Sequence, residues 1–190
     1  EGLFDTPGLL ELALLLARQN QFKEAVETAE KVAALEPKNL MVLAGVVDIA
    51  HRAGHKEMAI KHLRRGLVLV PGDLQLSQLL AQDLSALNQH EEALQLWTAL
   101  IEANPKNEPA LLGRVKTLLA AGKPAKAVAD TTTLLALAPG DSVYAYYNAL
   151  AHGITPAHQP VELNRQLFDG MAEVYDQHTV RGLRYQLPKI

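Results

Sequence analysis

The sequence predicts an all-α protein in which helix-turn-helix repeats of 34 residues stack into a right-handed solenoid. A row of prolines, a row of alanines and a row of Asn or Gly residues all recur at this one interval. The rows are Pro37, Pro71, Pro105 and Pro139; Ala25, Ala59, Ala93 and Ala127; and Asn20, Gly54, Asn88 and Gly122. Rows that share one period and one register are the signature of a repeat architecture.

Each repeat is expected to begin with a helix that carries an Asx residue as its N-cap. An Asp or Asn side chain there can accept hydrogen bonds from the free N–H groups of the first helical turn. The candidate caps are Asp5, Asn39, Asp73, Asn107 and Asp141. Apolar residues follow at helical spacing, and the Asn or Gly row then suits the left-handed residue that ends a helix. We expect these first helices over residues 6–19, 40–53, 74–87 and 108–121.

The second helix of each repeat carries the alanine row and ends before the proline, which cannot continue it. We expect second helices over residues 22–35, 56–69, 90–103 and 124–137. A methyl group at the alanine position lets the backbones of the two helices come close where they cross. No single repeat can bury its apolar face, so neighbouring repeats complete the core.

The period breaks after Pro139. A fifth first helix is expected over 142–152, but the turn position that follows carries Pro156 in place of Asn or Gly. A further helix over 161–177 has an apolar stripe, Leu163, Leu167, Met171 and Val174. We therefore expect an array over 1–152, with full repeats at 6–39, 40–73, 74–107 and 108–141, and an irregular C-terminal helical tail over 153–190. The tail is either a cap on the array or a linker to a domain outside this chain.

Composition excludes several classes of function. The net charge is −3 without a block of like charges, which argues against nucleic-acid binding; the densest basic run, 61–65, is interpreted as a solvated helix face. There is no cysteine, and hence no disulfide or thiolate metal site. No apolar run is long enough to span a membrane. We expect a cytoplasmic protein and, because the chain begins at Glu1, a native N-terminus further upstream.

The repeats resemble the tetratricopeptide repeat family in period, in the small residue of the first helix, in the alanine of the second and in the closing proline. The family's tryptophan in the first helix and tyrosine in the second are missing here. The resemblance implies a concave groove that holds a protein or peptide. It places the groove at Asp48, His51, Arg52, Gln78, Gln82, Ser85, Leu112, Lys116, Leu119 and Tyr146. The family's clamp for a C-terminal carboxylate is not matched.

Several residues admit a second interpretation. Asp48, His51 and His55 suggest a metal site, but no fourth ligand is in view, and solvated groove residues are favoured. Trp97 is interpreted as a core aromatic, and Arg114 as a side chain that reaches out to solvent with an aliphatic stem in contact with the protein.

Two surfaces are left open. The tyrosines of the fifth first helix, Tyr144, Tyr146 and Tyr147, fit an end cap and a docking patch equally well. The first helix is apolar nearly all round, with Leu9, Leu10, Leu12, Leu14, Leu15 and Leu16. Either preceding residues or a second copy of the chain would cover it, so self-association through this helix is expected as one of two outcomes.

The tail carries a second resemblance. Residues 164–178 and 182–188 resemble the segment that precedes the catalytic domain in bacterial S-adenosylmethionine-dependent methyltransferases with N-terminal tetratricopeptide repeats. That resemblance places Phe168, Tyr175, Asp176 and His178 near the mouth of the cofactor site, as lid or lead-in residues. The chain has no glycine-rich strand-turn-helix, so we expect these 190 residues to bind no cofactor and to catalyse nothing.

The sequence thus predicts a protein-interaction scaffold that forms the N-terminal part of a methyltransferase. A protein or peptide would occupy the groove, and its own catalytic domain would be a second partner. The alternative is a stand-alone adaptor for the assembly of a bacterial envelope or secretion complex, with the tail as a cap. An enzymatic function within these residues is disfavoured, because no nucleophile, metal set or phosphate loop is present.

Overall fold

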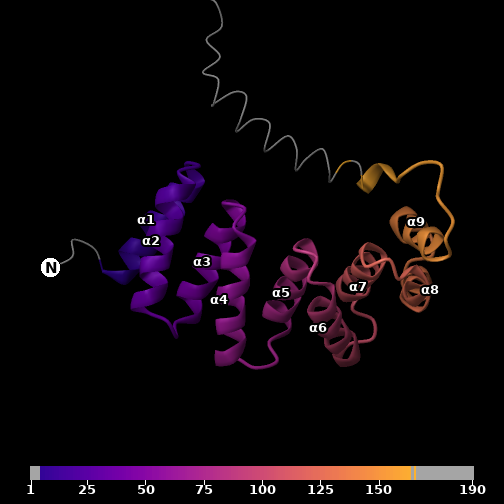
Figure 1. The fold of residues 1–190 in the computed structure, drawn as a ribbon, viewed down its shortest axis with the longest axis horizontal. Helices are drawn as coiled ribbons and strands as arrows, with labels where there is room; N and C mark the ends of the chain where they lie inside the picture. Colours follow the sequence, from indigo (N-terminus) through magenta and orange to yellow (C-terminus); the bar gives the residue numbers. More distant parts are fainter. Residues whose placement is uncertain (1–4, 164, 166–190) are drawn as a thin grey trace, which may run out of the picture. The chain divides into compact units, whose positions relative to one another are not determined.

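The computed structural model describes residues 5–163 and 165, and all the regular structure within them is helical (Figure 1). The elements are α1 (Thr6–Arg18), α2 (Phe22–Leu35), α3 (Leu40–Arg52), α4 (Lys56–Leu69), α5 (Leu74–Ala86), α6 (His90–Ala103), α7 (Glu108–Ala120), the 3₁₀ turn η1 (Pro124–Ala127), α8 (Val128–Leu137) and α9 (Ser142–Ala151). The expected fold class is confirmed. None of the helices in this part of the chain is long and apolar enough to cross a bilayer.

The chain divides into two compact units, Glu1–Lys123 and Pro124–Ile190. The first unit contains α1 to α7, and the second contains η1, α8, α9 and the residues that follow them. The domain boundary expected at residue 152 stays a prediction. Of the helix expected over 161–177, only its first residues are described; Leu167, Met171 and Val174 lie outside the described residues.

The Asx row forms the N-caps, as the sequence predicts. In each case a side-chain oxygen accepts from a backbone N–H of the first turn. The Gly8 N–H donates to Asp5 Oδ1 at 3.0 Å, and the Leu76 N–H donates to Asp73 Oδ1 at 2.8 Å. Asn39, Asn107 and Asp141 cap α3, α7 and α9 in the same way. Each cap satisfies donors that the helix itself cannot pair, which fixes where the first helix of the repeat begins.

The Asn and Gly row supplies the left-handed residues after the first helices. Asn20 and Asn88 have φ values of 60° and 59°, and Gly54 and Gly122 have 73° and 70°. In the fifth repeat this residue is Gly153, with φ 74°, rather than the residue at the turn position of the period. There α9 ends at Ala151, so the period fails at the end of the helix and not only at the proline that follows.

The second helices follow the prediction with one difference. The helix expected over 124–137 begins with the 3₁₀ turn η1 and becomes α-helical at Val128. A 3₁₀ turn is a common start to an α-helix, and the sequence pattern does not distinguish the two windings. The alanine row is fully buried at Ala25, Ala59, Ala93 and Ala127, as close approach of the helices requires.

The core of the first unit lies between its consecutive helices, each of which packs against the next (Figure 1). Among the first helices, α1 also packs against α3, and α5 against α7. No comparably close packing joins α3 to α5.

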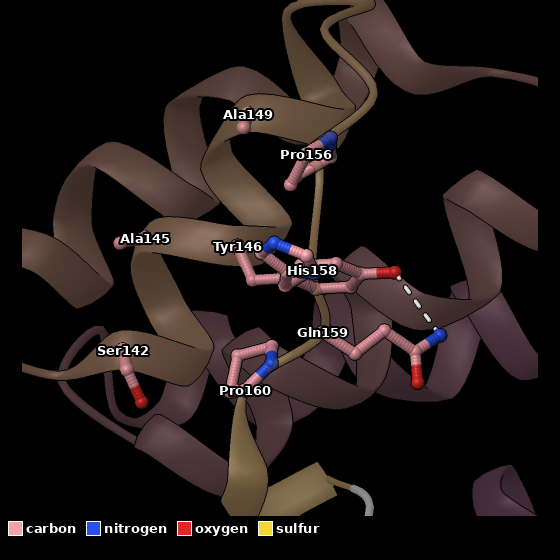
Figure 2. Close-up of a pocket in the computed structure, with 8 residues that line it drawn as sticks. All are labelled: Ser142, Ala145, Tyr146, Ala149, Pro156, His158, Gln159 and Pro160. Atoms are coloured by element: carbon pink, nitrogen blue, oxygen red, sulfur yellow. Dashed lines mark hydrogen bonds between the residues drawn. The ribbon is translucent and has the colours of Figure 1, made fainter.

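In the second unit, η1, α8 and α9 pack together, and the chain after α9 returns along that helix (Figure 2). The Thr131 hydroxyl of α8 donates to the Asn148 side chain of α9 at 2.9 Å. The Gln159 amide donates to the Tyr146 hydroxyl at 3.3 Å, and Ser142 donates to Glu162 at 3.0 Å. These bonds hold the segment 156–162 beside α9, where a regular repeat would place its second helix.

Candidate functional site

The first helices of repeats two to four, α3, α5 and α7, form what we call the inner face of the first unit. Two hollows open on this face, each with a volume of about 300 Å³. The apolar hollow is lined by Leu40, Leu43, Ala44, Val47, His62, Leu63, Gly66, Val70, Asp73, Gln75, Leu76 and Leu79. The Trp97 hollow is lined by Gln82, Ser85, Ala86, Trp97, Gly113, Lys116, Thr117 and Ala120.

The apolar hollow lies where α3 and α5 fail to pack closely. Its walls come from α3 and α5, and its floor comes from α4, where Gly66 leaves room for the Leu76 side chain. A Cβ at Gly66 would lie 3.0 Å from the Leu76 Cδ1 atom. Toward the C-terminal ends of the two helices a hydrogen bond joins them, because His51 Nε2 lies 2.7 Å from Asp83 Oδ2. The residues of α3 and α5 that line the hollow lie before His51 and Asp83, nearer the starts of the two helices.

The Trp97 hollow has a floor of hydrogen-bonded polar side chains. The Trp97 Nε1–H donates to the Thr117 hydroxyl at 3.1 Å, and the Ser85 and Thr117 hydroxyls lie 2.8 Å apart. The Thr117 hydroxyl also lies 2.8 Å from the Gly113 carbonyl oxygen and the Ser85 hydroxyl 2.7 Å from the Ala81 carbonyl oxygen, so one hydroxyl donates to its helix carbonyl while the other donates to its neighbouring hydroxyl. These bonds join α5, α6 and α7 and fix the indole, which is 1% exposed. The interpretation of Trp97 as a core aromatic is confirmed.

Gly113 is what allows the indole to reach the hollow. A Cβ at this position would lie 2.5 Å from Trp97 Cζ2 and 2.7 Å from Cε2 and Cη2. Real Cβ atoms do not come this close to carbon, so α7 can rest on the indole only because residue 113 has no side chain. Lys116 lies on α7 as well and also lines the hollow, and burial lowers the pKa of its ammonium group below the usual 10.5.

The predicted groove residues of α3 are hydrogen-bonded to carboxylates or accept from Arg52, and they line neither hollow. The Arg52 guanidinium donates to Asp48 at 2.8 Å, one helical turn away, and His51 pairs with the buried Asp83. Within residues 5–163 and 165, no three His, Asp or Glu side chains gather as a metal site would require. The metal interpretation of Asp48, His51 and His55 gains no support from this geometry.

The remaining groove residues fall into three places. Gln82, Ser85 and Lys116 meet in the Trp97 hollow. Gln78, Leu112 and Leu119 are half-buried on the same helices and line neither hollow. Tyr146 belongs to the second unit, where it lines a cavity of about 400 Å³ with Ser142, Ala145, Ala149, Pro156, His158, Gln159 and Pro160 (Figure 2). The groove assignment as a whole stays a prediction.

The structure also gives the positions of Arg114 and of the tyrosines of α9. Arg114 is half-buried, and its guanidinium donates to the Thr98 hydroxyl at 3.1 Å. The Tyr146 and Tyr147 rings pack edge to face with centroids 5.5 Å apart. Burial raises the pKa of Tyr147, with a smaller contribution from Tyr146. The four residues Phe168, Tyr175, Asp176 and His178 lie outside the described residues.

The basic run 61–65 is not uniformly solvated, and in this respect the sequence interpretation is wrong. His62 is fully buried, and its Nε2 atom lies 3.2 Å from Glu30 Oε1 of the preceding repeat. Burial lowers the pKa of His62. Burial would raise the pKa of Glu30, but hydrogen bonds from Lys61 and His62 outweigh it and lower that pKa. Helical spacing alone could have found this, because residues 62 and 63 share the face of Ala59.

Comparison with known proteins agrees with the repeat geometry. A profile described as "Tetratricopeptide repeat" matches residues 10–73 and 79–142. The chain belongs to the tetratricopeptide repeat family. A search of curated proteins found no match to the sequence. The resemblance of the tail to a methyltransferase segment is not shown by these comparisons.

Solved structures of tetratricopeptide repeat proteins share the fold. A crystal structure of MamA aligns with a TM-score of 0.67 and 16% identity, over 97% of this chain and 97% of that chain. Another MamA crystal structure aligns with a TM-score of 0.63 and 18% identity, over 73% of this chain and 81% of that chain. The structure of YrrB is described as "a TPR protein with an unusual peptide-binding site". It aligns with a TM-score of 0.62 and 18% identity, over 78% of this chain and 77% of that chain. At sequence identities this low, the similarity to these structures shows a shared fold and nothing further.

Proposed function

We propose that the chain is an interaction scaffold whose inner face holds an extended segment of a partner protein. The observation that carries this proposal is the pair of hollows on α3, α5 and α7. Ligand sites are commonly concave, mostly apolar and equipped with a few fixed polar groups, and both hollows fit that description. YrrB offers a precedent for a peptide site on this fold.

The test is a selection from a random displayed peptide library on the full chain, followed by affinity measurements on two variants. Ala44 is exposed on α3 and lines the apolar hollow, so Ala44→Leu fills the hollow without disturbing the core. Ala34 is exposed on α2 away from both hollows, which makes Ala34→Leu the matched control. We expect Ala44→Leu to weaken the selected peptides about tenfold, the effect of one lost apolar anchor. Equal affinity for both variants would refute the inner face as the site.

A finer proposal concerns the protein in which the array lies. Its support is the resemblance of residues 164–178 and 182–188 to the segment that leads into an S-adenosylmethionine-dependent methyltransferase domain. We propose that the array recruits a protein partner to such a domain and that S-adenosylmethionine binds there rather than in this chain. The coding sequence after Ile190 tests this directly. A strand, glycine-rich turn and helix would support it; their absence would favour the stand-alone adaptor in a bacterial envelope or secretion complex.

Two further proposals concern the state of the protein. Leu12 and Leu15 are exposed on α1, which is consistent with self-association through that helix. Sedimentation of the full chain and of Leu12→Lys tests it, and an unchanged monomer in both would exclude it. A cytoplasmic location is proposed from the composition, and fractionation of cells that express the full-length protein tests it.

A further inference from the structure

We propose that the apolar hollow holds one leucine or methionine side chain of an extended partner segment, and that Ala44 sets the size of that side chain. This occupant rests on the proposed function and gives the partner a chemistry at one place on the inner face. Its support is the lining of the hollow, the small residue at position 44 and the apolar side chains at the rim.

The lining of the apolar hollow favours an uncharged hydrocarbon group. Its aliphatic side chains come from α3, α4 and α5 and include Leu43, Val47, Leu63, Leu76 and Leu79. Its two titratable members are already engaged. The Asp73 carboxylate accepts from a backbone N–H as the cap of α5, and His62 Nε2 lies 3.2 Å from Glu30 Oε1. A buried hydrocarbon gains stability here, whereas a charged group would exchange its hydration for a largely hydrocarbon surface.

The repeats themselves show which kind of side chain fits between two first helices. Between α1 and α3 it is Leu10: a Cβ at Gly45 would lie 2.9 Å from Leu10 Cδ1, so the end of the leucine rests on α3. One period later the counterpart of Leu10 is Ala44, which is exposed and lines the hollow. Ala44 supplies three side-chain carbons fewer than Leu10 does. A leucine or methionine of the partner supplies them instead.

The volume of the hollow agrees with one side chain of this size. It measures about 300 Å³. An apolar cavity of about 150 Å³ is enough to hold a benzene molecule. The hollow therefore has room for a four-carbon side chain together with part of the backbone that carries it.

Exposed apolar side chains extend this surface at the starts of α3 and α5. Leu40 lines the hollow, and Leu40, Met41 and Leu74 are all exposed. Leu40 and Leu74 are equivalent positions, and the other members of their row are Thr6, Glu108 and Ser142. Leucine thus stands at this position only on the two helices that flank the hollow, where it enlarges the apolar surface that a partner can cover.

Gln75 provides for the backbone of an extended segment. It lies on α5, lines the hollow and is exposed. Backbone N–H and C=O groups that come to lie against an apolar surface need hydrogen-bond partners, and a glutamine amide offers both a donor and an acceptor. A helix in the same place has already paired these groups within itself. The surface therefore suits an extended segment better than a helix of a second copy.

The experiment starts from the peptides that the random library selects on the full chain, with both termini blocked so that they carry no charge. We expect them to share one leucine or methionine, the anchor. Replacement of the anchor by alanine should weaken binding about 10–100-fold, the effect of three buried carbons. Lysine or aspartate in its place should bind no better than alanine. An anchor that is aromatic or charged in the selected peptides would overturn the inference.

A double-mutant cycle shows whether the anchor meets residue 44. Ala44→Leu should weaken the peptide with its leucine anchor about tenfold but change the peptide with alanine there less than about twofold, because the smaller side chain leaves room for the new leucine. Ala44→Val, which adds two of the three carbons, should give an intermediate loss. Ala34→Leu, on the exposed side of α2, should change neither peptide.

The outcomes separate this inference from the proposed function. An equal loss for both peptides on Ala44→Leu would overturn the placement of the anchor while leaving the inner face as the site. A dimer of the chain alone that Ala44→Leu dissociates, measured by sedimentation, would assign the hollow to a second copy and overturn it too. A library without any binder would instead overturn the proposed function itself.

Discussion

Gly113→Ala is expected to destabilise the protein, although Gly→Ala within a helix ordinarily stabilises by up to about 1 kcal/mol. The new Cβ would lie 2.5 Å from Trp97 Cζ2, well inside van der Waals contact. The indole cannot retreat, because it is buried and its Nε1–H is bonded to Thr117. Overpacking of this kind costs about 1–3 kcal/mol. After the helix-propensity gain is subtracted, the net effect is a loss of up to about 2 kcal/mol in the free energy of unfolding.

The assay is urea denaturation followed by far-ultraviolet circular dichroism, which works in variants without the tryptophan. Trp97→Phe removes the ring atoms that the new methyl group would strike, so Gly113→Ala in that background should be neutral or stabilising. The difference between backgrounds is a coupling free energy of about 1–3 kcal/mol. Gly45→Ala serves as the control, because its Cβ would meet only the ends of the flexible Leu10 side chain. Stabilisation by Gly113→Ala in the parent protein, or the same effect in both backgrounds, would refute the reasoning.

Three further predictions concern the repeats. Ala93→Leu should overpack the crossing of α5 and α6 and cost about 1–3 kcal/mol, and an unchanged thermal melt would show that the register is misassigned. Gly54→Ala should cost about 1 kcal/mol because φ is 73°, whereas Asn88→Gly should be neutral or stabilising in the same denaturation assay. The unfolding free energy should fall as pH falls below about 6.5, because unfolded His62 binds a proton that the buried side chain resists. A titration of stability should show a smaller fall for His62→Gln, and an identical fall would exclude this residue as the cause.

The sequence was sufficient for the local parts of the fold because each of them depends on residue types at fixed positions. An Asx side chain caps a helix wherever it precedes one, and an Asn or Gly is needed wherever φ is positive. Asp73 and Gly54 could therefore be assigned from the period alone. The 3₁₀ start at Pro124 could not, because winding in the first turn depends on packing against the rest of the unit rather than on residue type.

The two hollows could not be predicted from the sequence, because they also depend on packing. Residues at equivalent positions of a repeat predict a uniform face, but α3 and α5 pack less closely than the helices on either side of them. Leu43 and Leu79 line the apolar hollow between α3 and α5, whereas Leu112 and Leu119 line neither hollow. Trp97 was expected as a core residue, yet its edge also forms the floor of a hollow, since only Gly113 stands opposite it. The position of a side chain relative to two neighbouring helices is a property of packing. Residue types at equivalent positions of the repeats do not predict it.

The side-chain bonds between repeats have a mechanical consequence. Glu30 with His62, His51 with Asp83, and Ser85 with Thr117 each join residues 32 positions apart, so each ties a repeat only to the next one. A pulling force applied to these repeats acts on nearest-neighbour contacts, which let units detach one after another. Each detached repeat would release about 110–120 Å of extended chain. The array should therefore lengthen in regular low-force steps, as a compliant tether does, and recover its length when the load is removed.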